Sequence, residues 1–253
     1  DRRSWAASDF YVREYFRGVA EEDLGAYSSS ALAAAALAHF QAASVRKRKR
    51  PLVRVFNAES ARDGWTSAHT IVETTIEDMP FLVDSLGMVF TEEDLSVHLM
   101  IHPVLAVRRD RAGRLLEIVD TEASEQGTIH ESWQHIQIDR IEDPAGLQAP
   151  ERRITRTLED VQLAVTDWNA MCERARAIAA ELPTQELPVP SHEAQETAEL
   201  LEWMADNHFT FLGYREYRLQ RGRSEVVAEA IPEGGLGILR VRRKRPQPTT
   251  LTG

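Results

Sequence analysis

The segment Thr74–Leu86 constrains the fold of this chain more than any other part of it. It indicates the end of a strand, a tight Asp-x-Pro corner and the opening turns of an amphipathic helix. Asp78 can cap that helix, with Pro80 in its first turn, where the missing N–H costs nothing. The buried stripe of the helix then follows helical spacing at Leu82, Leu86, Val89 and Phe90.

A corner of this kind suits the capture of a small carboxylate. Backbone N–H groups and the positive end of the helix dipole meet there, and no catalytic side chain is needed. The candidate ligand-binding residues are those around the corner: Asp78, Met79, Pro80, Phe81 and Asp84.

Alternating apolar residues predict the strands of a sheet around this helix. The expected strands are Leu52–Asn57, Thr70–Ile76, Leu95–Val107, Leu115–Val119 and Trp133–Ile141. Pro103 interrupts the third strand, and because proline cannot donate to a ladder, that part should lie at an edge or a bulge. In the last strand Ile136 and Ile138 are expected in the core, whereas the side chains of Trp133, His135 and Gln137 are expected on an interface or solvent face. Residues 9–44 are expected to be helical.

A long helical stretch follows Pro150. Its apolar residues keep a heptad seam at Ile154, Leu158, Val161, Val165, Trp168, Cys172, Ala175, Ala179 and Leu182. A continuous helix of this length would span about 43 Å, whereas a sheet of six-residue strands is only about 20 Å across. Part of the helix must therefore pack on another helix or domain. The predicted interface residues are Val161, Val165, Trp168 and Cys172.

Composition excludes several classes of function. The net charge of −10 argues against general nucleic-acid binding, and no apolar run is long enough to cross a membrane. A single cysteine fits a reducing cytoplasm. We interpret the basic runs Arg46–Arg50 and Arg240–Arg245 as solvated linkers, with a docking or nucleic-acid patch as the alternative. The chain starts at Asp1 and ends in a polar tail, so we expect a piece of something longer.

The usual catalytic and metal-binding patterns are missing. His98 and His102 would lie about 13 Å apart on one strand, too far to share an ion. The cluster Gly234–Gly237 matches neither a dinucleotide fingerprint nor a P-loop, and no Gly-x-Ser-x-Gly elbow occurs. We therefore expect no metal, no cofactor and no catalytic set in this segment.

The order strand–helix–strand–strand–helix–strand with its Asp-x-Pro corner resembles the ACT domain, a ferredoxin-like α+β unit that senses amino acids in metabolic enzymes. A closer resemblance is to the N-terminal region of the large bacterial NAD-specific glutamate dehydrogenases. Blocks along nearly the whole chain carry it, in the expected order: Val19–Leu24, Val53–Asn57, Asp78–Ser85, Ile101–Val104, Glu131–Trp133 with His135–Ile136, and His208–Arg215.

The resemblance implies an α+β fold in which an antiparallel sheet carries helices on one face. It divides the chain into an N-terminal helical segment (1–50), a first ACT-like domain (51–182), a proline-rich linker (183–191) and the start of a second ACT-like module (192–253). The implied parent enzyme is cytoplasmic and oxidises L-glutamate to 2-oxoglutarate and ammonia with NAD. Its catalytic lysine and dinucleotide-binding domain would lie beyond Gly253.

Two positions depart from the pattern that the resemblance implies. Phe81 stands where typical amino-acid-binding ACT domains have glycine, so we expect it to plug the pocket and turn the corner into a packed hinge. Asn169 stands where the family commonly has proline. A break at Asp167–Asn169 would divide the long helix into two.

Three functions follow as hypotheses. The first is a non-catalytic regulatory and assembly region whose partners are other domains and subunits of the parent enzyme. The second is an amino-acid-sensing allosteric module with its ligand at the Asp78–Phe81 corner. The third, an RNA-binding ferredoxin-like module, needs exposed aromatic side chains and a basic sheet face, which the strands do not offer.

Overall fold

The computed structural model describes residues 2–120, 127–221, 226–231, 234–240 and 249–251. The chain divides into two compact units, residues 1–159 and 160–253. The division falls inside helix α6 (Gln148–Thr166), earlier than the boundary predicted at residue 182. Each unit is therefore described by itself.

The first unit contains an antiparallel sheet in the order β1-β2-β6-β4-β5, with β3 also paired to β6. Its strands are β1 (Leu52–Asn57), β2 (Thr70–Glu77), β3 (Val97–Ile101), β4 (Val104–Arg109), β5 (Leu115–Val119) and β6 (Ile129–Ile138). The predicted strands are confirmed, although β6 begins four residues before Trp133. Pro103 separates β3 from β4, and the irregular register of β3 lies at its other end, between Val97 and Leu99.

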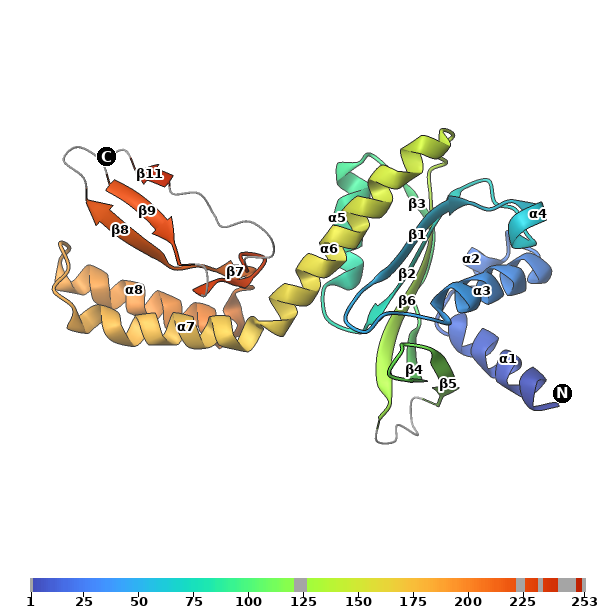
Figure 1. Cartoon of the computed structure of the whole chain (residues 1–253), viewed down its shortest axis with the longest axis horizontal. Helices are drawn as coiled ribbons and strands as arrows, with labels where there is room; N and C mark the ends of the chain where they lie inside the picture. The colour runs from blue at the N-terminus through green and yellow to red at the C-terminus, as the bar shows by residue number, and fades with distance from the viewer. Residues whose placement is uncertain (1, 121–126, 222–225, 232–233, 241–248, 252–253) are drawn as a thin grey trace. The chain divides into compact units, whose positions relative to one another are not determined.

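Helices α5 (Leu82–Glu92) and α6 cover one face of this sheet (Figure 1). The predicted stripe of α5 is buried, as are Ile154 and Leu158 of α6. Strand alternation directs Val72, Ile76, Ile136 and Ile138 to this face, and all four are fully buried. An α+β sheet with its helices laid across one face is the predicted ferredoxin-like arrangement.

The N-terminal helices cover the opposite face (Figure 1). They are α1 (Arg2–Tyr15), α2 (Glu21–Leu24) and α3 (Ser29–Ala43), and the Ser28 hydroxyl caps α3 by accepting from the Ala31 amide. Tyr11, Tyr15, Ala36 and Ala43 pack against a row of sheet residues: Leu99, Ile101, Leu105, Val107 and Trp133. The expectation of an interface or solvent face at Trp133, His135 and Gln137 was therefore wrong. These residues are 0–2% exposed because the preceding helices fold back over them.

The long helix is broken within Asp167–Asn169, the stretch that the sequence indicated as a candidate for a break. Asp167, with φ −95° and ψ 4°, ends α6 and precedes α7 (Trp168–Glu181). The heptad residues consequently belong to two different cores. Ile154 and Leu158 lie under the first sheet, whereas Cys172 and Ala175 pack with Ala205 in the second unit.

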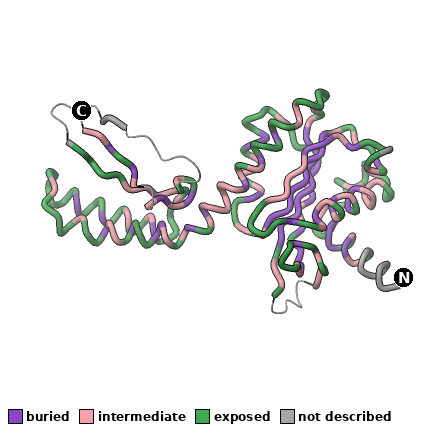
Figure 2. Tube along the Cα trace, viewed as in Figure 1, coloured by how far each residue is buried: buried purple, intermediate pink, exposed green. Residues whose placement is uncertain are grey.

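The second unit pairs α7 with α8 (Ser191–Trp203), which continues into a wide turn at Met204–His208. Its short strands form two small sheets: β7 (Gly213–Tyr214) with β10 (Leu236–Gly237), and β8 (Tyr217–Arg221), β9 (Val226–Ala230) and β11 (Thr249–Leu251). Figure 2 shows that continuous burial is concentrated in the sheet of the first unit. Short helical turns occupy Ser60–Asp63 (α4), Pro144–Leu147 (η2) and Leu182–Thr184 (η3).

Candidate ligand-binding corner and buried polar clusters

The corner after β2 differs in detail from the prediction. The Asp78 amide donates to the carbonyl of His130 (2.9 Å), which holds the chain against β6. Helix α5 starts only at Leu82, with Phe81 as its N-cap and no side-chain capping bond. The predicted Asp78 cap, with Pro80 in the first helical turn, was therefore wrong. The left-handed backbone at Phe81 turns the chain after both residues.

Phe81 keeps the backbone conformation of a glycine. Its φ of 73° lies in the left-handed region, which costs a bulky residue about 1–2 kcal/mol. The residue is 49% exposed, so packing does not offset this cost. The expected packed hinge is not formed by this side chain, because about half of Phe81 is exposed to solvent.

A string of polar residues leads inward from the corner on the α5 side of the sheet. His102 Nε2 lies 2.9 Å from Ser132 Oγ, and Gln134 Nε2 donates to the same hydroxyl (3.2 Å). Thr74 is the cross-strand partner of Gln134, and both are fully buried. Burial lowers the pKa of His102, while the nearby Asp78 carboxylate acts in the opposite direction.

Two atoms of this string have no hydrogen-bond partner among the described residues: Gln134 Oε1 and Thr74 Oγ1. Leaving a buried acceptor unpaired costs about 1–3 kcal/mol. The string therefore offers a buried carbonyl acceptor for an ammonium group. The start of α5, eight residues after Thr74 in the sequence, favours a carboxylate.

The five predicted ligand residues do surround this helix start. Asp78, Pro80, Phe81 and Asp84 are exposed, and Met79 is half-buried. The prediction missed Thr74, His102, Ser132 and Gln134. One signal was available: Thr74 occupies an inward position between Val72 and Ile76, where a hydroxyl is out of place in an apolar face.

A second polar cluster lies on the opposite face, beneath α1 and α3. His39 Nδ1 is 2.8 Å from the Tyr15 hydroxyl and its Nε2 is 3.1 Å from Thr75 Oγ1. Glu73 accepts from Arg54 (3.0 Å) and lies 3.5 Å from His135 Nδ1. Burial lowers the pKa of His39 to about 4. For Glu73 burial acts to raise the pKa, but His39, His135 and Arg54 together hold it below its ordinary value.

A third cluster overturns part of the linker interpretation. Arg46, the first residue of the basic run, is 2% exposed and donates to the buried Glu131 carboxylate from Nε (3.0 Å) and Nη2 (2.7 Å). Arg109 donates to both oxygens of Glu131, and the Trp133 indole adds a further bond. Arg46 is thus part of the core. In the second run, Arg240 pairs with Asp167, and residues 241–245 lie outside the described residues.

The predicted interface residues lie on two helices: Val161 and Val165 on α6, and Trp168 and Cys172 on α7. Cys172 is 4% exposed and packs with Trp168, Ala205 and Phe211, so it is a core residue of the second unit. Val161 and Val165 are half-buried on α6. A role between subunits stays a prediction for these residues.

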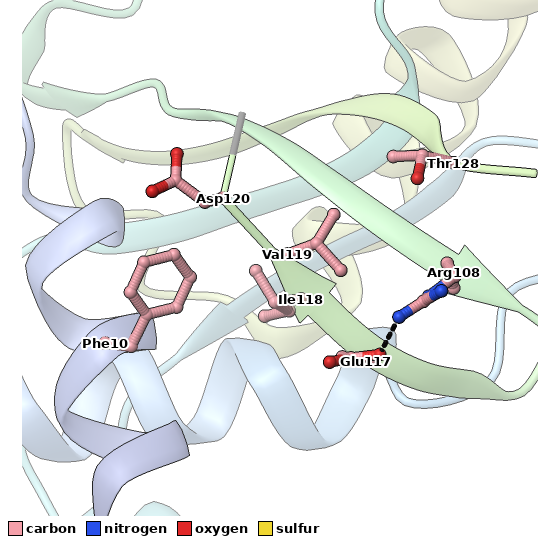
Figure 3. Close-up of a pocket in the computed structure, with 7 residues that line it drawn as sticks. All are labelled: Phe10, Arg108, Glu117, Ile118, Val119, Asp120 and Thr128. Carbon is pink, nitrogen blue, oxygen red and sulfur yellow. Dashed lines mark hydrogen bonds and ion pairs between the residues drawn. The ribbon is translucent and has the colours of Figure 1, made fainter. Parts of the chain in front are cut away.

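A surface pocket of about 310 Å³ lies beside β5 (Figure 3). Its lining is Phe10, Arg108, Glu117, Ile118, Val119, Asp120 and Thr128. Arg108 and Glu117 pair with each other across it. The pocket shares no residue with the corner. Residues 121–126, which follow Asp120 in the sequence, lie outside the described residues.

Within the described part of the chain, no group of three His, Cys, Asp or Glu side chains is arranged to hold a metal ion. His98 is engaged elsewhere, with Nε2 2.7 Å from Asp139 Oδ1 and its ring stacked on His69. Among the same residues, no helix is both long and apolar enough to cross a bilayer.

Three features define an ACT-type α+β domain: the antiparallel sheet, the Asp-x-Pro corner and the helices α5 and α6 across one face. The chain belongs to the family described as "Glutamate dehydrogenase, ACT1 domain", which matches residues 11–154. That match includes the end of α1 from Tyr11 onward and all of α2 and α3, so much of the helical cover of the second face is part of the family's domain.

Curated relatives carry one shared name. The chain is 35% identical over 207 residues to an NAD-specific glutamate dehydrogenase of Pseudomonas aeruginosa, which matches 82% of this chain and 13% of that protein. It is 32% identical over 246 residues to the same-named protein of Halomonas elongata, matching 97% and 15%. A Mycobacterium tuberculosis relative is 29% identical over 216 residues, matching 84% and 13%. The chain thus spans a small fraction of their length.

Proposed function

We propose that this chain is the N-terminal regulatory and assembly region of a cytoplasmic NAD-dependent glutamate dehydrogenase and carries out no chemistry itself. The parent enzyme would convert L-glutamate and NAD to 2-oxoglutarate, ammonia and NADH, with NAD bound elsewhere in the parent. The coverage of both sheet faces carries the proposal. A small sheet packed on two sides, with its buried polar groups clustered between the sheet and its helices, suits a rigid scaffold better than an active site.

Other domains and subunits of the parent enzyme are the proposed partners. Val161 and Val165 offer half-buried apolar surface on α6, and we place a subunit contact there. The proposed start of a second ACT-like module after residue 192 would extend the same scaffold. An RNA-binding role has little support, because helices cover the face that would have to stack bases.

The assembly role is tested on the full-length parent enzyme. Val161→Glu with Val165→Glu should reduce oligomer size in light scattering, because charges do not enter an apolar interface without a large desolvation cost. Gln148→Glu with Thr166→Glu, which adds the same two negative charges at exposed positions of the same helix, is the matched control. If circular dichroism shows that the valine variant is folded and its oligomer size is unchanged, the proposed contact on α6 is wrong.

A second candidate, amino-acid sensing at the corner, is favoured by the unpaired Gln134 Oε1 and Thr74 Oγ1. The ammonium group of the ligand would reach this acceptor, and its carboxylate would meet the amides at the start of α5. Calorimetric titration with the common amino acids tests it. Binding should be lost in Gln134→Met and kept in the surface control Gln195→Met, whereas silence of the wild-type chain across the whole panel would leave only the structural role.

A further inference from the structure

Two basic segments that are far apart in the sequence form one surface. Val45 and Arg114 form a β-bridge, the Arg46 amide donates to Gly113 O (3.0 Å) and the Leu115 amide donates to Ser44 O (2.8 Å). The close approach requires Gly113, since a Cβ there would lie 2.0 Å from the Arg46 carbonyl oxygen. The contact joins the loop after α3 to the turn between β4 and β5.

This junction gathers six exposed cations, which we call the basic patch: Lys47, Arg48, Lys49, Arg50, Arg111 and Arg114. None of the six side chains pairs with a carboxylate among the described residues. Two aliphatic side chains stand beside them, Val45 (53% exposed) and Leu116 (66% exposed). An unpaired positive patch with apolar members, in a chain of net charge −10, suits an acidic protein surface.

Helix α8 in the second unit has the complementary composition. Its inward side carries Ala194 and Ala198, and it contains no lysine or arginine. Helical spacing places five exposed residues together on its outward side, which we call the acidic face: Glu193, Glu196, Glu199, Leu200 and Trp203. Leu200 is 55% and Trp203 52% exposed.

We infer that the acidic face of α8 in one copy of this chain docks on the basic patch of a second copy. Glutamates meet unpaired arginines and lysines, while Leu200 and Trp203 cover Val45 and Leu116. In a two-fold dimer each copy would supply one patch and one acidic face, so that the same contact would be made twice. Nucleic acid is the less suitable occupant, because the patch has no exposed aromatic side chain beside it and the rest of the chain is strongly acidic. The inference rests on the proposed assembly role and specifies which two surfaces meet between subunits.

Charge exchange tests it on the full chain. The patch is reversed by four substitutions, Lys47→Glu, Arg48→Glu, Arg111→Glu and Arg114→Glu, which leave two cations against four carboxylates. The acidic face is reversed by Glu196→Lys with Glu199→Lys, which leaves one carboxylate against two cations. Each variant alone should dissociate more than about tenfold more readily in sedimentation, because like charges then face each other. An equimolar mixture of the two variants should restore the dimer, since both contacts again join opposite charges. Wild-type association should weaken from about 0.01 M to about 1 M salt.

The control makes the same change of charge at four exposed arginines outside the patch: Arg140→Glu, Arg152→Glu, Arg156→Glu and Arg218→Glu. Circular dichroism establishes that each variant folds. The inference is overturned if association survives either reversal, or if the mixture stays monomeric. It is also overturned if the patch binds an oligonucleotide while the patch variant self-associates like the wild type. If these variants behave as wild type while the α6 valine variant disrupts the parent oligomer, the inference fails and the proposed assembly role stands.

Discussion

Arg46 and Glu131 are 85 residues apart in the chain and form a fully buried ion pair, with Arg46 Nη2 2.7 Å from Glu131 Oε1. Arg109 adds a second guanidinium to the same carboxylate. Burial acts to raise the pKa of Glu131, but the two arginines hold it below its ordinary value. The pair ties the end of the N-terminal helical segment to the centre of the sheet.

Removing the carboxylate charge should be costly. Glu131→Gln leaves Arg109 without its counter-charge and Arg46 with only the more distant Glu77 (3.8 Å). Breaking a buried pair in this way costs about 3–5 kcal/mol. Urea denaturation measures the loss. The control is Glu117→Gln, whose pair with Arg108 is exposed and should contribute less than about 1 kcal/mol. Equal losses in the two variants would show that the buried triad adds no special stability.

Stability should fall in mild acid because of His39. This histidine is held neutral, with a pKa of about 4 in the folded chain against an ordinary pKa of 6.5, so the unfolded chain binds more protons between these values. Its contribution is complete above about pH 6.5 and is lost as the pH falls toward 4. We expect unfolding at pH 5 to be easier by about 2 kcal/mol than at pH 8.

The difference between pH 8 and pH 5 should be smaller in His39→Gln and unchanged in the exposed control His192→Gln. Keeping the measurement above pH 5 limits the contribution of Glu73, whose lowered pKa removes stability only as pH falls through the carboxylate range. A His39→Gln curve parallel to wild type would show that this histidine does not titrate as argued.

At position 81, glycine should give a more stable protein than alanine. Phe81→Gly relieves the left-handed backbone, whereas Phe81→Ala retains it, so the glycine variant should be more stable by about 1 kcal/mol. At Met88, exposed within α5, the order should reverse by about the same amount. Thermal denaturation of the four variants measures both differences. The same order at both positions would mean that the conformation at Phe81 is not strained.

Asp167 should anchor the turn that carries β10. Its carboxylate accepts from the Gly237 amide (2.8 Å) and from Arg240 Nε (3.1 Å). Asp167→Ala should therefore cost about 1–3 kcal/mol of local stability and speed hydrogen exchange at residues 234–240. The exposed Asp206→Ala is the control. Arg240→Gln should have a smaller effect because its side chain is 48% exposed, and unchanged exchange in Asp167→Ala would contradict the anchor.

Local pattern was enough for much of the first unit. The alternation in Thr70–Ile76 and the break at Pro103 predicted β2, β3 and β4, and the stripe from Leu82 to Phe90 predicted the buried side of α5. These signals are short-range, because a strand or helix with one buried face must repeat its apolar residues at the period of its own backbone. The corner residues were predicted as a group for the same reason, although the start of α5 was misplaced.

The apolar repeat of a strand or helix does not show which other segments of the chain cover it. In the sequence, His135 and Gln137 resemble a polar strand face, and Arg46 resembles part of a solvated linker. In the structure they are buried, because α1 and α3 fold over the sheet and the turn at Gly113 contacts the loop after α3. The sequence alone determined the strands, the corner helix and the family resemblance. Only the tertiary structure decided which polar residues are buried, because that depends on contacts between segments up to about a hundred residues apart, where each charge must find its partner or destabilise the fold.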